Sequence, residues 1–164
     1  MVFELIEDLH PDLHKLMWLV GNWHGNGHRE FPGVGKHEFE QDVMFHHDGR
    51  PFIQYVSQSW ITDSAGERTG PGEIESGFLL PKEEEGEIEL VLSTYEGYGG
   101  ALLGRVDGPR IEMATKWQAR PESETEYTEQ RMYGLVDSEL MYAIDRETPF
   151  AELQSYAWGR LRRV

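Results

Sequence analysis

An all-β fold is what this amino-acid sequence predicts: one domain over residues 1–164, built as a closed, up-and-down antiparallel β-barrel of about ten strands. Three observations predict it. From Gly21 onward, apolar and polar residues alternate in short runs, which is the pattern of strands with one buried face. Glycine, proline and aspartate separate these runs at positions typical of turns. One early segment alone has the spacing of an amphipathic helix, so a helical or α/β fold is not expected.

The helix is expected from Asp12 to Val20. Its apolar residues recur three or four positions apart, as on one face of a helix. They are Leu13, Leu16, Met17 and Val20. Gly21 ends the helical pattern. A helix of this length is too short to be stable alone, so we expect its apolar face to cap one end of the barrel.

The strands follow the helix at regular intervals. They are expected near residues 21–31, 37–46, 51–61, 72–80, 86–94, 98–106, 109–118, 124–134, 139–146 and 153–163. The clearest hairpin signal is Asp107-Gly108, because aspartate and glycine adopt the backbone conformations that a two-residue turn requires.

The charge balance limits the partners of this chain. It contains 15 lysines and arginines against 30 aspartates and glutamates, a formal net charge of −15. Such a field repels phosphates, so neither nucleic acid nor an anionic membrane is an expected partner. The sequence has no apolar run long enough for a membrane helix and no signal-peptide pattern, so we expect a cytoplasmic protein. It has no cysteine, which excludes disulfides and thiolate metal sites.

Gly21, Trp23, Gly25 and Gly27 form the pattern G-x-W-x-G-x-G directly after the helix. In a strand, Trp23 and the two glycines that follow it lie on one face. We expect Trp23 to be buried at the closed end of the barrel, beside the helix and under an arginine of the last strand. The glycines allow a bend or close packing of a neighbouring strand. Calycin barrels share this short pattern, so it favours a calycin-like fold.

The longer pattern resembles the nitrobindin family. The matching stretches, after the helix and G-x-W-x-G-x-G, are Phe31-Pro32, Val43 to Pro51, Glu75 to Phe78 and Leu161 to Val164. The resemblance implies a ten-stranded barrel related in shape to fatty-acid-binding proteins, with haem b held at the barrel mouth by one histidine of the last strand. It also implies nitric oxide binding, peroxynitrite isomerisation and assembly as a homodimer.

The expected haem ligand is missing from this chain. Counting back from the C-terminus, the position of the family's axial histidine is Tyr156, and all seven histidines lie within the first 47 residues. A phenol must lose its proton before it binds iron well, whereas a neutral imidazole binds directly. Arg160, four residues on, is a cation that could favour the charged form of Tyr156. We therefore expect no cofactor and no metal, with haem b as the alternative.

The resemblance and the strand alternation together place five residues in a candidate ligand site. They are Tyr156, Trp158, His47, Phe52 and Arg160. Alternation puts Trp158 on the same face as Tyr156. Three functions stay open. The chain is a barrel that binds a small apolar or aromatic molecule, without haem and without enzymatic activity. Alternatively, it is a haem enzyme that isomerises peroxynitrite through Tyr156 or a displaced histidine. The third function is transport of fatty acids or other apolar ligands, with Arg160 and a tyrosine holding a carboxylate.

Overall fold

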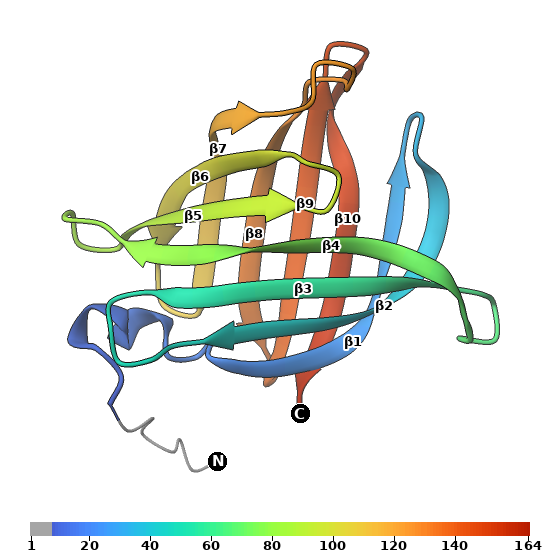
Figure 1. Ribbon diagram of the computed structural model, residues 1–164. Coiled ribbons are helices and arrows are strands. Elements are labelled where there is room, and N and C mark those ends of the chain that lie inside the picture. Colours follow the sequence, from blue (N-terminus) through green and yellow to red (C-terminus); the bar gives the residue numbers. More distant parts are fainter. Residues whose placement is uncertain (1–7) are drawn as a thin grey trace.

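Ten antiparallel strands form a closed barrel in the structure, a computed structural model that describes residues 8–164 (Figure 1). The strands are β1 (Gly21–Phe31), β2 (Gly35–His46), β3 (Ile53–Thr62), β4 (Arg68–Pro81), β5 (Glu87–Thr94), β6 (Gly99–Val106), β7 (Arg110–Ala119), β8 (Thr128–Val136), β9 (Glu139–Thr148) and β10 (Ala151–Arg163). Each strand pairs with the next along the chain, and β1 pairs with β10 to close the sheet. The predicted fold class is therefore confirmed.

All ten expected strands are present, and two of them begin well away from the predicted residue. β4 begins at Arg68 instead of residue 72, because an irregular pairing with β3 extends the sheet beyond Pro71. β8 begins at Thr128 instead of residue 124. The residues before it form a loop, in which the Arg120 Nε donates to the backbone carbonyl oxygen of Glu124 at 3.1 Å. The hairpin predicted at Asp107-Gly108 does join β6 to β7.

The predicted helix is shorter and tighter than expected. It is a 3₁₀ helix, η1 (Pro11–Leu16), and not an α-helix that reaches Val20. Leu13, Leu16 and Leu19 recur every three residues, and each is at most 1% exposed. A repeat of three matches the three residues per turn of a 3₁₀ helix, so this geometry buries Leu13 and Leu16 together, and Leu19 follows in the turn after η1. No helix within residues 8–164 is long and apolar enough to cross a membrane.

Trp23 closes the end of the barrel beside η1. It is 1% exposed, and its indole N–H donates to the backbone carbonyl oxygen of Leu19 at 2.9 Å. The guanidinium carbon of Arg163, on β10, lies 4.2 Å from the centre of the indole ring. Arg163 also donates to the carbonyl oxygens of Trp18 and Val20, which ties the last strand to the segment after η1. The predicted burial of Trp23 near the helix and under a last-strand arginine is confirmed.

The glycines of the G-x-W-x-G-x-G pattern make room for these contacts. Gly21 has a φ of +139°, and a Cβ there would overlap the guanidinium of Arg163. A Cβ on Gly25 or Gly27 would overlap the backbone of β10, which runs beside them. The pattern therefore encodes the close approach of the first strand to the last, where the barrel closes.

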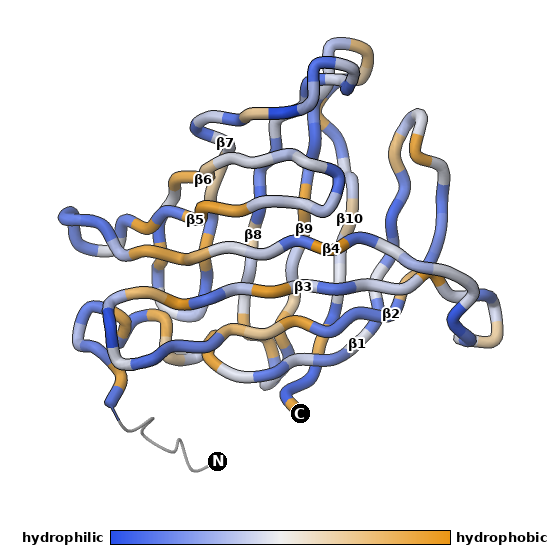
Figure 2. The backbone as a smooth tube through the Cα atoms, viewed as in Figure 1, coloured by the Kyte–Doolittle hydropathy of each residue, from blue (hydrophilic) through white to orange (hydrophobic). Residues whose placement is uncertain are grey.

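The interior of the barrel has two halves. The closed half, at the end covered by η1, is apolar. Besides Trp23, its buried side chains include Phe45, Ile53, Leu79, Ile88 and Ile111. The open half, toward the other end, contains the buried polar side chains Arg29, Gln41, Ser57, Ser59, Glu129 and Arg131. Figure 2 shows hydrophobic stretches gathered around η1 and the neighbouring strand ends.

Candidate functional site

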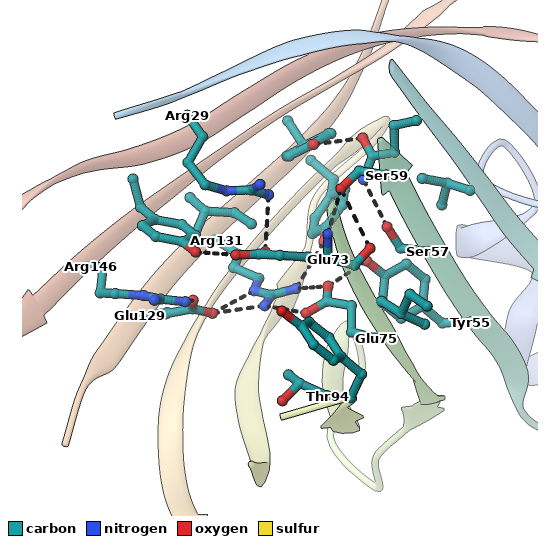
Figure 3. A pocket seen from close by; sticks show the side chains of 18 of the residues that line it. Arg29, Tyr55, Ser57, Ser59, Glu73, Glu75, Thr94, Glu129, Arg131 and Arg146 are labelled. Atoms are coloured by element: carbon teal, nitrogen blue, oxygen red, sulfur yellow. Dashed lines mark hydrogen bonds and ion pairs between the residues drawn. The ribbon is translucent and has the colours of Figure 1, made fainter. Parts of the chain in front are cut away.

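A polar cavity occupies the open half of the barrel. It is small, with a cavity volume of about 40 Å³. The charged residues that line it are Arg29, Arg131, Arg146, Glu73, Glu75, Glu96 and Glu129, and the tyrosines are Tyr55, Tyr95, Tyr127, Tyr133, Tyr142 and Tyr156. Figure 3 shows the labelled side chains reaching toward one another from several strands. None of the histidines in the described chain lines this cavity.

Arg131 is the centre of a buried ion-pair network. From β8, its Nε and Nη2 donate to Glu129 Oε2 at 2.9 and 2.8 Å. Its Nη1 and Nη2 donate to the two carboxylate oxygens of Glu75 at 2.6 and 3.0 Å, and the Tyr55 hydroxyl donates to the same carboxylate at 2.6 Å. Both forks of the Arg131 guanidinium are therefore occupied by carboxylates. The pair with Glu75 has two parallel hydrogen bonds, which is the strong geometry, whereas both donors to Glu129 meet one oxygen.

Arg146 shares Glu129 with Arg131 and contacts two aromatic rings. From β9, its Nη2 and Nε donate to Glu129 Oε1 at 2.6 and 3.2 Å. Its guanidinium carbon lies 3.6 Å from the centre of the Tyr156 ring and 3.8 Å from the centre of the Tyr127 ring. Both rings stabilise the cation through their π electrons. Arg146 therefore covers the ring of Tyr156 inside the barrel.

Arg29, Glu73 and Tyr156 form a second cluster in the cavity. Nη2 of Arg29, on β1, lies 2.9 Å from Glu73 Oε2. The Tyr156 hydroxyl donates to the other oxygen of the same carboxylate. Nη1 of Arg29 donates to Nε2 of His37 at 3.2 Å. The Glu73 side chain is 39% exposed, so this cluster reaches the solvent whereas Arg131 does not.

Burial and neighbouring charges set the protonation states in the cavity. Burial raises the pKa of Tyr156 far above its ordinary value, and the carboxylate of Glu73 raises it further. Tyr156 is therefore a neutral phenol at pH 7. Burial also acts to raise the pKa of Glu75, but Arg131, with Tyr55 and Arg146, outweighs it, and the pKa falls below its usual value, so this carboxylate stays charged. Burial and a nearby guanidinium lower the pKa of His37, which stays neutral and accepts a hydrogen bond.

Comparison with known proteins identifies the family. Residues 12–163 match the model of the THAP4-like, heme-binding beta-barrel domain. The chain belongs to this family. A protein named peroxynitrite isomerase from Nocardioides sp. is 40% identical, with 99% of each chain covered. Ferric nitrobindin-like proteins from Streptomyces griseus and Cutibacterium acnes are 37% and 34% identical over 99% of this chain, which corresponds to 87% and 99% of theirs. The resemblance to nitrobindins is confirmed.

A solved structure has the same barrel. The crystal structure of Rv2717c from M. tuberculosis superposes with a TM-score of 0.82 at 27% sequence identity, covering 95% of this chain and 99% of that one. The nitrobindin-like barrel described above is therefore shared, over nearly all of its length, with an experimentally determined protein.

Of the five residues predicted to contact a ligand in this nitrobindin-like barrel, Tyr156 lines the cavity and the other four do not. Trp158 was expected on the same face as Tyr156, and this expectation is wrong. The register between β10 and β9 shifts between Ser155 and Ala157, and such a bulge interrupts the alternation of the strand. Trp158 is consequently 47% exposed on the outer face, where its ring stacks on His28 with the ring centres 6.0 Å apart.

Arg160, His47 and Phe52 also lie outside the cavity. Arg160 is exposed and donates to Glu139 on the outer surface, so it cannot act as the cation beside Tyr156. His47 lies in the β2–β3 connection, where its Nδ1 accepts a bond from the Gly49 backbone at 3.2 Å. The ring of Phe52 packs edge-on against another phenylalanine. Ligand contact by these three residues stays a prediction that the geometry of the cavity does not support.

The sequence interpretation missed the charged side chains that line the cavity. A signal for Arg29 was available, because Trp23, Gly25 and Gly27 were assigned to one strand face and the same alternation continues to residue 29. For Glu73, Arg131 and Arg146, the alternation of β4, β8 and β9 gives the inward direction. It does not indicate which of the chain's many charged residues pair inside the barrel.

A haem held by an axial ligand from the last strand does not fit the residues present here. At the position where the family resemblance puts that ligand, the Tyr156 hydroxyl donates its proton to Glu73, and Arg146 covers the ring. The phenol is neutral, and a neutral phenol is a poor donor to iron. The space beside it is crossed by the ion pairs of Arg29 and Arg131.

Proposed function

We propose that this chain is a small-molecule-binding barrel that does not hold haem through an axial ligand. The observation that carries the proposal is the hydrogen bond from Tyr156 to Glu73 at the position where the family resemblance expects a histidine. The homologues named ferric nitrobindin-like protein support a place within the nitrobindin family, and the open half of the barrel supplies a cavity.

The lining of the cavity favours a small polar ligand over the apolar or aromatic ligand that the sequence suggested. Its walls carry charged residues and tyrosines, and a ligand that enters must satisfy these groups or leave them unpaired. A fatty acid chain would place methylene groups against Arg131 and Glu75, which are buried and charged. Transport of fatty acids is accordingly the function that this lining favours least.

A second candidate function is peroxynitrite isomerisation by bound haem. The observation in its favour is the 40% identity to the Nocardioides protein of that name. In this chain the axial ligand of the haem iron would have to be Tyr156 or a displaced histidine. His37 is the histidine that contacts the cavity cluster, through Arg29, and its lowered pKa gives a neutral imidazole. If His37 is the iron ligand, the His37→Ala variant should lose the bound haem.

Titration of the purified chain with haem tests the proposal. The wild-type protein should be colourless and should give no histidine-type Soret band with added haem. Tyr156→His should raise the haem affinity by about tenfold or more, because it places an imidazole where the family resemblance puts the axial ligand, and Trp158 points away from it. Tyr156→Phe is the matched control, since it changes the same side chain without adding a ligand.

Two results would contradict the proposal. Stoichiometric haem in the wild-type protein would show that another ligand serves, and its loss in His37→Ala would identify that ligand. Equal spectra for Tyr156→His and Tyr156→Phe would mean that position 156 is not the axial position in this chain.

A further inference from the structure

The three arginines inside the barrel differ in how completely their donors are used. The side-on fork of a guanidinium consists of Nε and Nη2, which can bind the two oxygens of one carboxylate together. In Arg131 and Arg146, both atoms of this fork donate to Glu129. In Arg29, Nη2 contacts Glu73, but Nε is buried and has no hydrogen-bond partner. One of the two donors of the Arg29 fork, Nε, is therefore unpaired.

The free donor is a cost to the folded protein unless something binds it. A buried N–H without an acceptor loses its hydration and gains nothing in return. Native proteins contain few buried donors without an acceptor, so we expect a bound molecule to accept a hydrogen bond from the Nε of Arg29. The hydroxyl of Thr94, which lines the same cavity, is also buried without a partner. Figure 3 shows Arg29 and Thr94 on different sides of the ion-pair cluster.

Glu73 differs from the other two interior carboxylates. Its side chain is 39% exposed, against 14% for Glu75 and 4% for Glu129. Glu75 and Glu129 each accept hydrogen bonds from a guanidinium through two of its nitrogens, whereas Glu73 makes one contact with Arg29 and one with the Tyr156 hydroxyl. Glu73 is therefore the interior carboxylate that can leave for solvent at the lowest cost.

We propose that Arg29 and Tyr156 form the binding site for a small monovalent oxyanion of the carboxylate type, and that Glu73 is its built-in competitor. This inference rests on the proposed function, since it assigns the ligand class of the same cavity. A free oxyanion accepts from Nε and Nη2 of Arg29 together, which the tethered carboxylate of Glu73 does not do. It also takes over the hydrogen bond from the Tyr156 hydroxyl.

The charges in the cavity fit this exchange. Glu96 also lines the cavity but is exposed, so the interior arginines Arg29, Arg131 and Arg146 are balanced inside the barrel by Glu73, Glu75 and Glu129. When Glu73 turns out to solvent, the interior is left with one positive charge in excess, which one monovalent anion neutralises. A buried unpaired cation is costly, so departure of Glu73 and arrival of the oxyanion are coupled. The site selects a single negative charge, and the small cavity limits the ligand to a few heavy atoms.

Titration with sodium formate, at constant ionic strength, tests the inference. The readout is the set of arginine Nε–H resonances in ¹⁵N–¹H correlation spectra, with Arg29 assigned by its absence in Arg29→Lys. Formate should shift the Arg29 signal and leave that of Arg131 in place, since both forks of Arg131 are occupied. Glu73→Gln should bind formate about tenfold more tightly, because the competitor loses its charge.

Two variants control for the change of charge and for the hydroxyl. Glu67→Gln removes one negative charge from an exposed turn and should leave the formate affinity within twofold of wild type. Tyr156→Phe in the Glu73→Gln background keeps the ring against Arg146 and should weaken formate binding by about fivefold, the usual value of one hydrogen bond. An unmoved Arg29 signal, or equal formate affinity in Glu73→Gln and Glu67→Gln, would overturn the inference.

The haem titration separates this inference from the proposed function. A chain that binds neither haem nor formate retains the proposed function and loses the oxyanion site. A chain that binds haem stoichiometrically, while formate still shifts Arg29, loses the proposed function and retains the site.

Discussion

The two halves of the barrel are built on the same ten strands but are stabilised by different forces. In the closed half, Trp23 and the leucines of the segment that includes η1 bury apolar surface, and apolar burial needs no particular partner. In the open half, Arg131 and Glu129 are buried and Glu75 is 14% exposed, and each of these charges depends on the others. The closed half can stabilise the barrel without the open half, whereas the reverse is not expected.

This difference separates folding from function within one domain. Replacing a buried ion-pair network by apolar side chains is often neutral or stabilising, so stability alone does not explain Arg131, Glu75 and Glu129. A cavity that binds a polar molecule does need fixed charges inside a rigid wall. We infer that the closed half carries most of the stability and that the open half carries the selectivity.

The largest expected effect is the loss of Trp23, which tests the closed half. Trp23→Ala should lower the free energy of unfolding by about 3–5 kcal/mol, because it empties a fully buried aromatic site and removes the hydrogen bond to Leu19. Urea unfolding followed by circular dichroism measures this. Trp158→Ala, on the outer face, is the matched control and should cost less than about 1 kcal/mol. Equal losses in the two variants would mean that the closed half is not the main source of stability.

The next effect tests the open half. Arg131→Met should lower the free energy of unfolding by about 3 kcal/mol, because Glu75 and Glu129 then face each other with one arginine fewer. Arg105→Met is the control, since the Arg105 side chain is 63% exposed. An Arg131→Met variant as stable as wild type would show that water reaches the network and replaces the arginine.

The two halves were also unequally predictable from the sequence. In the closed half, the alternation of strands and the G-x-W-x-G-x-G pattern predicted the burial of Trp23 and the approach of an arginine, because both depend on local spacing. In the open half, Glu75 on β4 meets Arg131 on β8, 56 residues away. Pairing between distant strands follows from the closure of the barrel, which no local pattern encodes for particular side chains.

A bulge in β10 accounts for the wrong placement of Trp158. The alternation of β10 holds from Trp158 to Leu161, with exposed and buried residues in turn, but Tyr156 and Ala157 are both buried. The bulge between Ser155 and Ala157 depends on how β10 pairs with β9, and an extra residue in one strand leaves no mark on composition or hydropathy. Tyr156, which the family resemblance placed in the ligand site, lines the cavity, whereas strict alternation placed Trp158 on the wrong face.

A smaller effect is expected where the closed half joins β1 to β10. Gly27→Ala should cost about 1–3 kcal/mol, because the new methyl group would overlap the backbone of β10 and the ring of Phe39. Gly70→Ala, where a Cβ meets nothing within 4 Å, is the matched control and should be nearly neutral. Thermal unfolding of the two variants measures the difference. Similar melting temperatures would show that the first and last strands separate without cost.

The smallest expected effect is a change in acid stability. Burial acts to raise the pKa of Glu75, but Arg131, Tyr55 and Arg146 together lower it more, so the folded protein binds the proton less readily than the unfolded chain does. The stabilisation is therefore complete above the unfolded pKa of about 4.5 and is lost as the pH falls through the folded pKa. Glu75→Gln should show a shallower loss of stability with falling pH than wild type, measured by urea unfolding between pH 6 and pH 3.

Glu139 gives the comparison that makes this test specific to the open half. Hydrogen bonds from Arg162 and then Arg160 lower the pKa of Glu139, but both arginines are exposed, so salt should screen these pairs. At low salt, Glu139→Gln and Glu75→Gln should both flatten the acid dependence. At 1 M salt, where charges are screened within about 3 Å, the effect of Glu139→Gln should vanish and that of Glu75→Gln should persist, because its partner Arg131 is buried. If salt removes both effects equally, water fills the open half and its charges behave like those of the outer surface.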